Sequence, residues 1–147
     1  MNLLLIGAGQ LGSRHLQSCL KYSKDINIYV VDNSEASIIL AKTRALEIKK
    51  NANHNIFFLK NMSMIRENSF DYLIIATAAN SRFKVLAEAL KLFSVKYAIL
   101  EKILFQDLQS YQESLKLIND NKVTAFVNCP LRAYPFFKEI KEKYISH

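Results

Sequence analysis

The stretch that decides the fold reads NLLLIGAGQLG and runs from Asn2 to Gly12. Its aliphatic half, residues 2–6, is typical of a buried strand, and a helix of about residues 10–22 is predicted to come next. The glycines therefore lie where a first strand turns into a first helix. Gly7 permits the tight turn, Gly9 lets the backbone approach a pyrophosphate, and Gly12 lets the helix pack close to the strand.

A dinucleotide is the ligand that this turn favours. The start of a helix offers unpaired N–H groups and the positive end of its dipole to phosphates. Asp32 closes the next predicted strand, residues 26–31, where its carboxylate can accept hydrogen bonds from ribose hydroxyls. The same charge repels a 2′-phosphate, which favours NAD over NADP. The alternatives are a glycine turn without a ligand and a helix-capping Asp32, although Asn33 and Ser34 already supply caps.

Strand-like and helix-like segments alternate along the rest of the chain. Further strands are predicted at 56–59, 71–77, 96–100 and 122–128, with a polar turn at 51–55 and an irregular connection at 61–68. This alternation predicts an α/β fold, a doubly wound parallel sheet of six strands in the order 3-2-1-4-5-6 with helices on both faces. The later helices are marked by apolar residues at helical spacing: Ile38, Ala41, Ala45 and Ile48; Phe83, Leu86, Ala87 and Leu90; Leu108, Tyr111, Leu115 and Ile118, after an Asp107 cap; and Phe137, Ile140 and Tyr144.

Composition excludes several classes of protein. The chain has 147 residues, half of them hydrophobic, which suits one globular domain. Cys19 and Cys129 are too few for a disulfide framework and match no metal spacing, so we expect a reducing, cytoplasmic setting. No apolar run is long enough for a membrane span. The net charge of +7 is spread among acids, which favours a solvated surface over a nucleic-acid arm.

Two further segments fall at the predicted carboxyl edge of the sheet. The small residues of 76–80 suit the close passage of a nicotinamide ribose, although the segment is also explained as a strand end with Asn80 or Ser81 capping a helix. Lys102 can point into the cofactor crevice and stabilise alkoxide charge, but on pattern alone a solvent-exposed loop lysine is favoured. For His15, contact with a ligand and packing at the helix–sheet interface are both open.

These motifs together resemble the Gfo/Idh/MocA family of sugar and inositol oxidoreductases. The resemblance rests on residues 7–15, Asp32, Ala76-Thr77, Glu101-Lys102 and the loop 128–135. It implies NAD(H) as cofactor, a sugar, sugar-nucleotide or polyol substrate, and Lys102 as a catalytic residue that positions substrate and nicotinamide. The predicted cofactor-binding residues are Gly7, Gly9, Gln10, Leu11, Gly12, Asp32, Asn33, Ala76, Thr77, Asn80 and Glu101.

The chain departs from the family pattern in three ways. Ile103 replaces the usual proline, and Ala78 and Arg82 stand where the family often has proline and histidine. We expect residues 1–128 to form the cofactor domain and 129–147 to begin a linker or helix, with the substrate domain outside this chain. We therefore expect little dehydrogenase activity from this chain alone. We also expect an exposed aromatic strip on the last helix to cause self-association or partner binding, unless the helix folds back on the sheet's edge.

Other functions also fit part of the pattern. A stand-alone NAD-sensing regulatory module has the same Gly–Asp pattern but does not need Glu101-Lys102 or the loop at 132–135. A nucleic-acid binder lacks a recognisable motif here, and Gly12 favours a dinucleotide over the cofactor of a methyltransferase.

Overall fold

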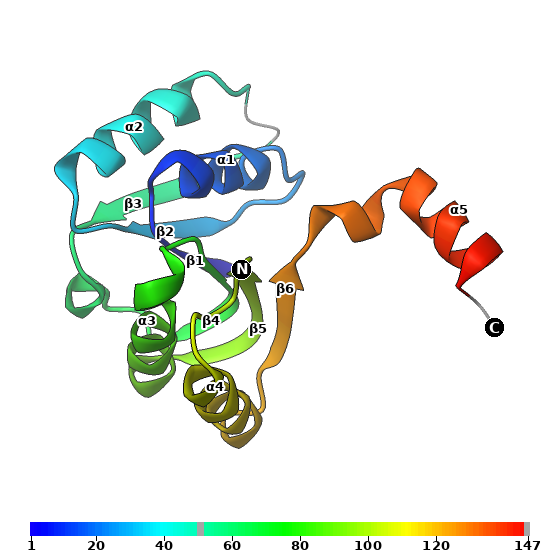
Figure 1. The fold of residues 1–147 in the computed structure, drawn as a ribbon. Coiled ribbons are helices and arrows are strands. Elements are labelled where there is room, and N and C mark those ends of the chain that lie inside the picture. Colours follow the sequence, from blue (N-terminus) through cyan, green and yellow to red (C-terminus); the bar gives the residue numbers. More distant parts are fainter. Residues whose placement is uncertain (50–51, 146–147) are drawn as a thin grey trace.

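A computed structural model describes residues 1–49 and 52–145 and places six parallel strands in one sheet (Figure 1). The strand order is β3-β2-β1-β4-β5-β6, which confirms the predicted doubly wound topology. Every strand pairing runs in parallel register, from Leu3 beside Ile28 to Glu101 beside Asn128. The strands are β1 (Asn2–Ile6), β2 (Asn27–Val31), β3 (Asn55–Leu59), β4 (Ser69–Ile75), β5 (Ser94–Glu101) and β6 (Thr124–Asn128).

Helices cover both faces of the sheet. Figure 1 shows α1 (Gln10–Cys19) and α2 (Glu35–Leu46) on one face, and α3 (Ala79–Leu92) and α4 (Leu108–Asp120) on the other. Short 3₁₀ turns, η1 (Met62–Met64) and η2 (Pro130–Ala133), come after β3 and β6 respectively. The turn at η1 lies inside the connection that was predicted to be irregular.

The first strand is apolar on both sides because both sides are buried. Leu3 and Leu5 pack in the layer beneath α1 and α2, with Leu16, Ile38 and Ala41. Leu4 and Ile6, which point the other way, pack with Leu86 and Leu90 of α3. Alternation of side chains across one strand thus divides the core into two layers, one for each pair of helices.

Side-chain caps decide where two helices begin. The Ser34 hydroxyl accepts a hydrogen bond from the Ser37 amide (3.3 Å), and the Asp107 carboxylate accepts one from the Ser110 amide (2.7 Å). Both were predicted caps. At α3 the alternative in which Asn80 or Ser81 caps the helix is wrong, because α3 begins at Ala79, with Ala78 at its N-cap and no side-chain cap bond.

The first helix is shorter than predicted and ends at Cys19. The amides of Lys21 and Tyr22 donate to the carbonyls of Ser18 and Cys19, three residues back. Such bonds tighten and close a last turn, so the chain leaves the helix before Tyr22.

The last helix, α5 (Pro135–Tyr144), stands clear of the sheet at the end of an extended arm (Figure 1). The aromatic side chains of Phe136 and Tyr144 are 64% and 69% exposed. The alternative in which this helix folds back on the sheet's edge is therefore wrong. Helix α5 ends at Tyr144, and the rest of the helix predicted up to the C-terminus includes residues 146–147, which lie outside the described residues. In the described part of the chain, no helix combines the length and the apolar character that crossing a membrane requires.

Candidate functional site

The glycine-rich turn meets two packing demands of the fold. Gly7 has φ +94°, and a Cβ at this position would lie 2.9 Å from the backbone of Ala76 and Thr77. A Cβ on Gly12 would lie 1.7 Å from the carbonyl oxygen of Gly7. Both positions exclude any larger residue for internal reasons. The close contact predicted for Gly12 is thus made with the turn itself.

Gly9 differs from the other two glycines. The nearest atom to a Cβ at Gly9 would be the Ser37 hydroxyl oxygen, 4.0 Å away. Among the described residues, nothing fills the space above Gly9, which lies at the N-cap of α1. The turn therefore leaves room for another molecule next to the exposed N–H groups of the helix start.

A cleft of about 500 Å³ opens at the carboxyl edge of the sheet, beside this turn. It lies where β1 and β4 are neighbours, which is the point where the strand order reverses and where open α/β sheets bind ligands. Of the predicted residues, the cleft brings together Gly7, Gly9, Asp32, Asn33, Ala76 and Thr77.

The cleft also contains residues that sequence reasoning missed. Lys60, Asn61 and Met62 line it from the connection after β3. The sequence could have pointed to them, because they directly follow a predicted strand and so fall at the same edge of the sheet as the other site residues. Lys60 also pairs with Glu35 at 3.4 Å, and both side chains are largely exposed.

Asp32 connects the glycine-rich turn to the start of α2. One carboxylate oxygen accepts a hydrogen bond from the Ala8 amide (2.7 Å) and the other from the Ser34 amide (2.8 Å). Since Ser34 caps α2, Asp32 is not the cap itself. An ionised carboxylate has about four acceptor sites, so capacity remains for a ligand hydroxyl.

Gln10, Leu11 and Asn80 lie at the starts of helices with exposed side chains, and none is among the cleft-lining residues. Arg44 of α2 donates to the backbone carbonyl of Gln10 (2.8 Å), to its side-chain oxygen (2.5 Å) and to the Ser13 hydroxyl (2.6 Å). This arginine, to which no local sequence motif points, fixes the start of α1 against α2.

Thr77 has an unusual hydroxyl group. Its Oγ1 atom is buried and has no hydrogen-bond partner among the described residues, although Thr77 itself lines the cleft. Buried polar groups are nearly always paired in native proteins. A hydroxyl left unpaired beside a cleft is a candidate contact for a ligand.

Glu101 is buried, with 3% of its surface exposed, and does not line the cleft. His15 Nε2 lies 2.6 Å from its carboxylate and Asn128 Nδ2 lies 2.5 Å from the same oxygen. Because an ionised carboxylate only accepts, both partners donate. Glu101 therefore connects α1, β5 and β6, and His15 lies at the helix–sheet interface.

Lys102 follows Glu101 with an exposed side chain, outside the cleft lining, and the Lys102–Ile103 peptide bond is cis. Beneath this segment lies the guanidinium of Arg82. Burial lowers the pKa of Arg82 from its ordinary value, and the nearby Glu101 carboxylate partly offsets that effect.

Burial has the opposite effect on the pKa of the Cys19 thiol and raises it to about 11, which leaves Cys19 a neutral thiol at pH 7.

The geometry defines a class of protein. A doubly wound sheet, a glycine turn before α1, an acid at the end of β2 and a cleft at the switch point characterise a dinucleotide-binding Rossmann domain. The sequence profile described as "Oxidoreductase family, NAD-binding Rossmann fold" matches residues 1–129. The chain belongs to the Gfo/Idh/MocA oxidoreductase family and contains that family's NAD-binding domain.

Solved structures share this fold at low sequence identity. The WlbA (WbpB) dehydrogenase from Thermus thermophilus, in complex with NAD and UDP-GlcNAcA, matches all of this chain with a TM-score of 0.75 and 18% identity. An oxidoreductase from Agrobacterium radiobacter, in complex with NAD+, L-tartaric acid and magnesium, matches 99% of this chain with a TM-score of 0.75 and 17% identity. A Gfo/Idh/MocA family oxidoreductase from Vibrio cholerae matches 97% with a TM-score of 0.75 and 14% identity.

The chain spans less than half the length of these structures, covering 47%, 40% and 43% of them respectively. At such identities the likeness concerns the fold. A search of curated proteins found no match.

Proposed function

We propose that this chain is the cofactor-binding part of an NAD-dependent oxidoreductase that acts by hydride transfer on a hydroxyl-bearing carbon of a sugar, sugar nucleotide or polyol. The observation that carries the proposal is the cleft that joins the open space at Gly9 to the Asp32 carboxylate. The UDP-GlcNAcA complexes of the WlbA dehydrogenases support the substrate class. A second, substrate-binding part belongs to the proposal, with residues 129–147 leading toward it.

The residues present fit NAD. The turn at Gly7, Gly9, Gln10, Leu11 and Gly12 would hold the pyrophosphate, since it combines open space with the start of a helix. Asp32 and Asn33 would hold the adenosine ribose. The nicotinamide side would be held by Ala76, the unpaired hydroxyl of Thr77, and Asn80.

Lys102 would be the catalytic residue of this chain. NAD, when bound, supplies the carbon that accepts hydride. The Lys102 ammonium donates hydrogen bonds, so it can orient a substrate hydroxyl and stabilise the negative charge that develops on its oxygen. Glu101 would support this end of the site through its hydrogen bonds to His15 and Asn128.

Both cysteines are free thiols, which suits the reducing cytoplasm, where we place the reaction.

The choice of cofactor tests the proposal directly. We expect calorimetric titration to give tighter binding of NAD+ than of NADP+, by about tenfold or about 1.4 kcal/mol, because Asp32 repels the 2′-phosphate. Asp32→Ala should narrow this ratio. It should also lower stability, since two backbone amides lose their acceptor. The ratio of affinities is therefore the decisive quantity.

Ser34→Ala is the matched control, because it removes a cap in the same loop and leaves the carboxylate in place. It should leave the NAD+ to NADP+ ratio unchanged. Equal affinities in the unaltered chain would contradict the assignment of Asp32.

We expect no appreciable NAD+ reduction with sugars or polyols from this chain alone, since Lys102 cannot supply both a substrate pocket and a proton acceptor. Robust, Lys102-dependent turnover would contradict the proposed second part.

A further inference from the structure

Arg82 is a buried arginine whose hydrogen bonds go to backbone carbonyl oxygens. It lies near the start of α3 and is 3% exposed. One terminal nitrogen donates to the carbonyls of Glu101 (2.5 Å), Ile103 and Leu104 (3.0 Å), and the other donates to the carbonyl of Thr77. If the side chain at position 82 pointed to solvent, these carbonyl groups would have only water as a hydrogen-bond donor.

These carbonyls belong to the two loops that bear the nicotinamide side of the proposed site. Thr77 follows β4 and carries the unpaired hydroxyl at the cleft. Glu101, Ile103 and Leu104 surround Lys102 at the end of β5 and on the loop after it. Arg82 thus holds the residues on both sides of Lys102 and connects them to the loop of Thr77.

The end of β5 is held from both faces of the sheet. On the face of α1, the Glu101 side chain accepts hydrogen bonds from His15 and Asn128. On the face of α3, the Glu101 carbonyl accepts one from Arg82. The planar guanidinium has five N–H donors, which suits it to several acceptors that lie apart, whereas a lysine offers one compact ammonium.

We propose that Arg82 is a positioning residue that holds the loops of Thr77 and Lys102 in the arrangement that receives the nicotinamide half of the cofactor. The proposal rests on the function proposed above. It separates the two ends of the proposed site, because the adenosine half is built from the glycine-rich turn and Asp32. The hydrogen bonds of Arg82 go instead to the loop of Thr77, which lines the cleft, and to the loop of Lys102, which lies outside the cleft lining.

This separation gives the test a readout that a merely structural role would not move. NAD+ and ADP are titrated calorimetrically into the unaltered chain, Arg82→Lys, Arg82→Met and the control Arg66→Met. Arg66 is an exposed arginine in the connection before β4, so its substitution removes a guanidinium without disturbing either loop. ADP samples the adenosine half alone.

Both Arg82 variants should bind NAD+ about three- to tenfold more weakly relative to ADP, with the larger loss in Arg82→Met. The control should keep the ratio of the unaltered chain. An unchanged NAD+ to ADP ratio in a folded Arg82 variant overturns the proposal. If the unaltered chain binds no NAD+, the proposed function fails, and this inference fails with it. NAD+ binding with an unchanged ratio overturns this inference only.

If neither Arg82 variant folds, NMR relaxation of the unaltered chain tests whether Arg82 holds the loop of Lys102. A loop held by Arg82 should give backbone order parameters of about 0.85 at Lys102, Ile103 and Leu104, the value of rigid backbone. Values below about 0.6 in these amides would show a flexible loop and overturn the proposal.

Discussion

At the scale of single residues, the three glycines of the first turn are needed for different reasons. Gly7 and Gly12 are required by neighbouring backbone atoms at 2.9 and 1.7 Å from a Cβ. Gly9 meets no such atom, so the fold by itself would accept a side chain there. A substitution at Gly9 can therefore separate ligand binding from folding, which the other two positions cannot do.

We predict that Gly9→Val folds and does not bind NAD+. Gly9 has φ −63°, which any residue adopts, and it makes no side-chain cap bond, so the loss of stability should be at most about 1 kcal/mol. The added side chain would occupy the space proposed for the pyrophosphate. Thermal unfolding measures the first effect and calorimetric titration the second.

Gly12→Ala provides the contrast for this prediction. Its Cβ would overlap the carbonyl oxygen of Gly7, and overpacking of this kind costs about 1–3 kcal/mol or more. We expect it to destabilise the chain before binding can be measured. NAD+ binding by Gly9→Val at the affinity of the unaltered chain would remove Gly9 from the site.

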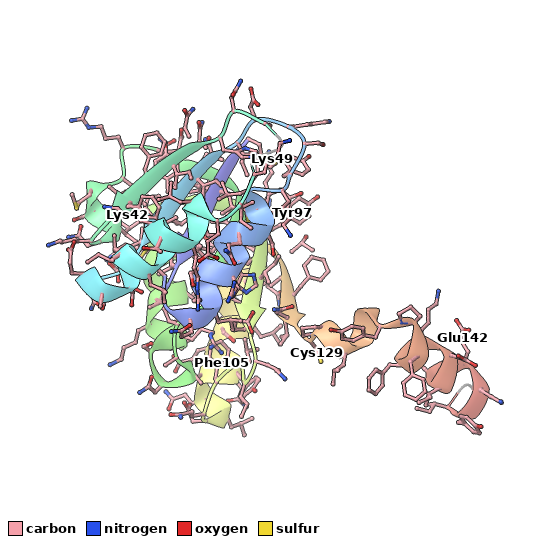
Figure 2. The ribbon with its side chains drawn as sticks, turned by 90° about the horizontal axis from the view of Figure 1, so that it is seen from above. Lys42, Lys49, Tyr97, Phe105, Cys129 and Glu142 are labelled. Atoms are coloured by element: carbon pink, nitrogen blue, oxygen red, sulfur yellow. The ribbon has the colours of Figure 1, made fainter. Side chains whose placement is uncertain are left out.

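At the scale of elements, α5 is the helix without a layer to pack on. Figure 2 shows it, with Glu142, at the far end of an arm that leaves the body of the molecule near Cys129. Its aromatic residues Phe136 and Phe137 contact each other, with ring centroids 5.6 Å apart, while both remain exposed. An exposed apolar patch of a few hundred Å² commonly marks an association surface.

We therefore predict that the chain self-associates through α5. Phe137→Glu combined with Tyr144→Glu should convert it to a monomer, since two charges would replace exposed aromatic surface. Sedimentation across a concentration series measures the change in mass. Lys138→Gln with Lys141→Gln lowers the net charge by the same amount and should leave association intact. A chain that is monomeric from the outset, with a mass unaffected by the first pair, would exclude this interface.

At the scale of the whole molecule, an ion pair joins three strands at the edge of the sheet opposite the cleft. Asp71 of β4 accepts hydrogen bonds from the Asn2 amide of β1 (3.0 Å) and from Lys96 Nζ of β5 (2.5 Å). The hydrogen bond from Lys96 is the main cause that holds the pKa of Asp71 below its ordinary value, and the Asn2 amide adds to it. The Asp107 carboxylate has a lowered pKa as well, because it accepts hydrogen bonds from the Ser110 amide and hydroxyl at the start of α4.

These lowered pKa values predict a loss of stability in acid. A carboxylate with a lowered folded-state pKa stabilises the fold above its unfolded pKa, and this contribution disappears as the pH falls through the folded value. The free energy of unfolding should thus decline below about pH 5. Asp71→Asn should be less stable at pH 7 and should show a shallower decline, as measured by urea unfolding at several pH values.

Asp120→Asn is the control for this experiment, because it removes an exposed carboxylate at the end of α4. Its pH profile should follow that of the unaltered chain. NAD+ affinity at pH 7 should be unaffected by Asp71→Asn, since Asp71 lies at the opposite edge from Asp32. An acid decline of undiminished slope in Asp71→Asn would show that the pair does not contribute.

Local sequence signals were sufficient to predict the topology, the first turn and the acid after β2. Strand and helix patterns are local, and right-handed crossovers leave few ways to arrange them, so the six alternating strands could be matched to the order of a doubly wound sheet. Gly7, Gly12 and Asp32 could be identified because their demands arise within β1, α1 and β2, which follow one another in the chain. The caps at Ser34 and Asp107 were predictable for the same reason.

Contacts between distant elements could be known only from the folded chain. His15 meets Glu101 from 86 positions away, and Arg82 meets the Leu104 carbonyl from 22. Such pairs depend on which strands become neighbours and on how each helix lies across them, and no local pattern records either. The direction of α5 is of the same kind, because an amphipathic pattern specifies an apolar face but not the surface that covers it.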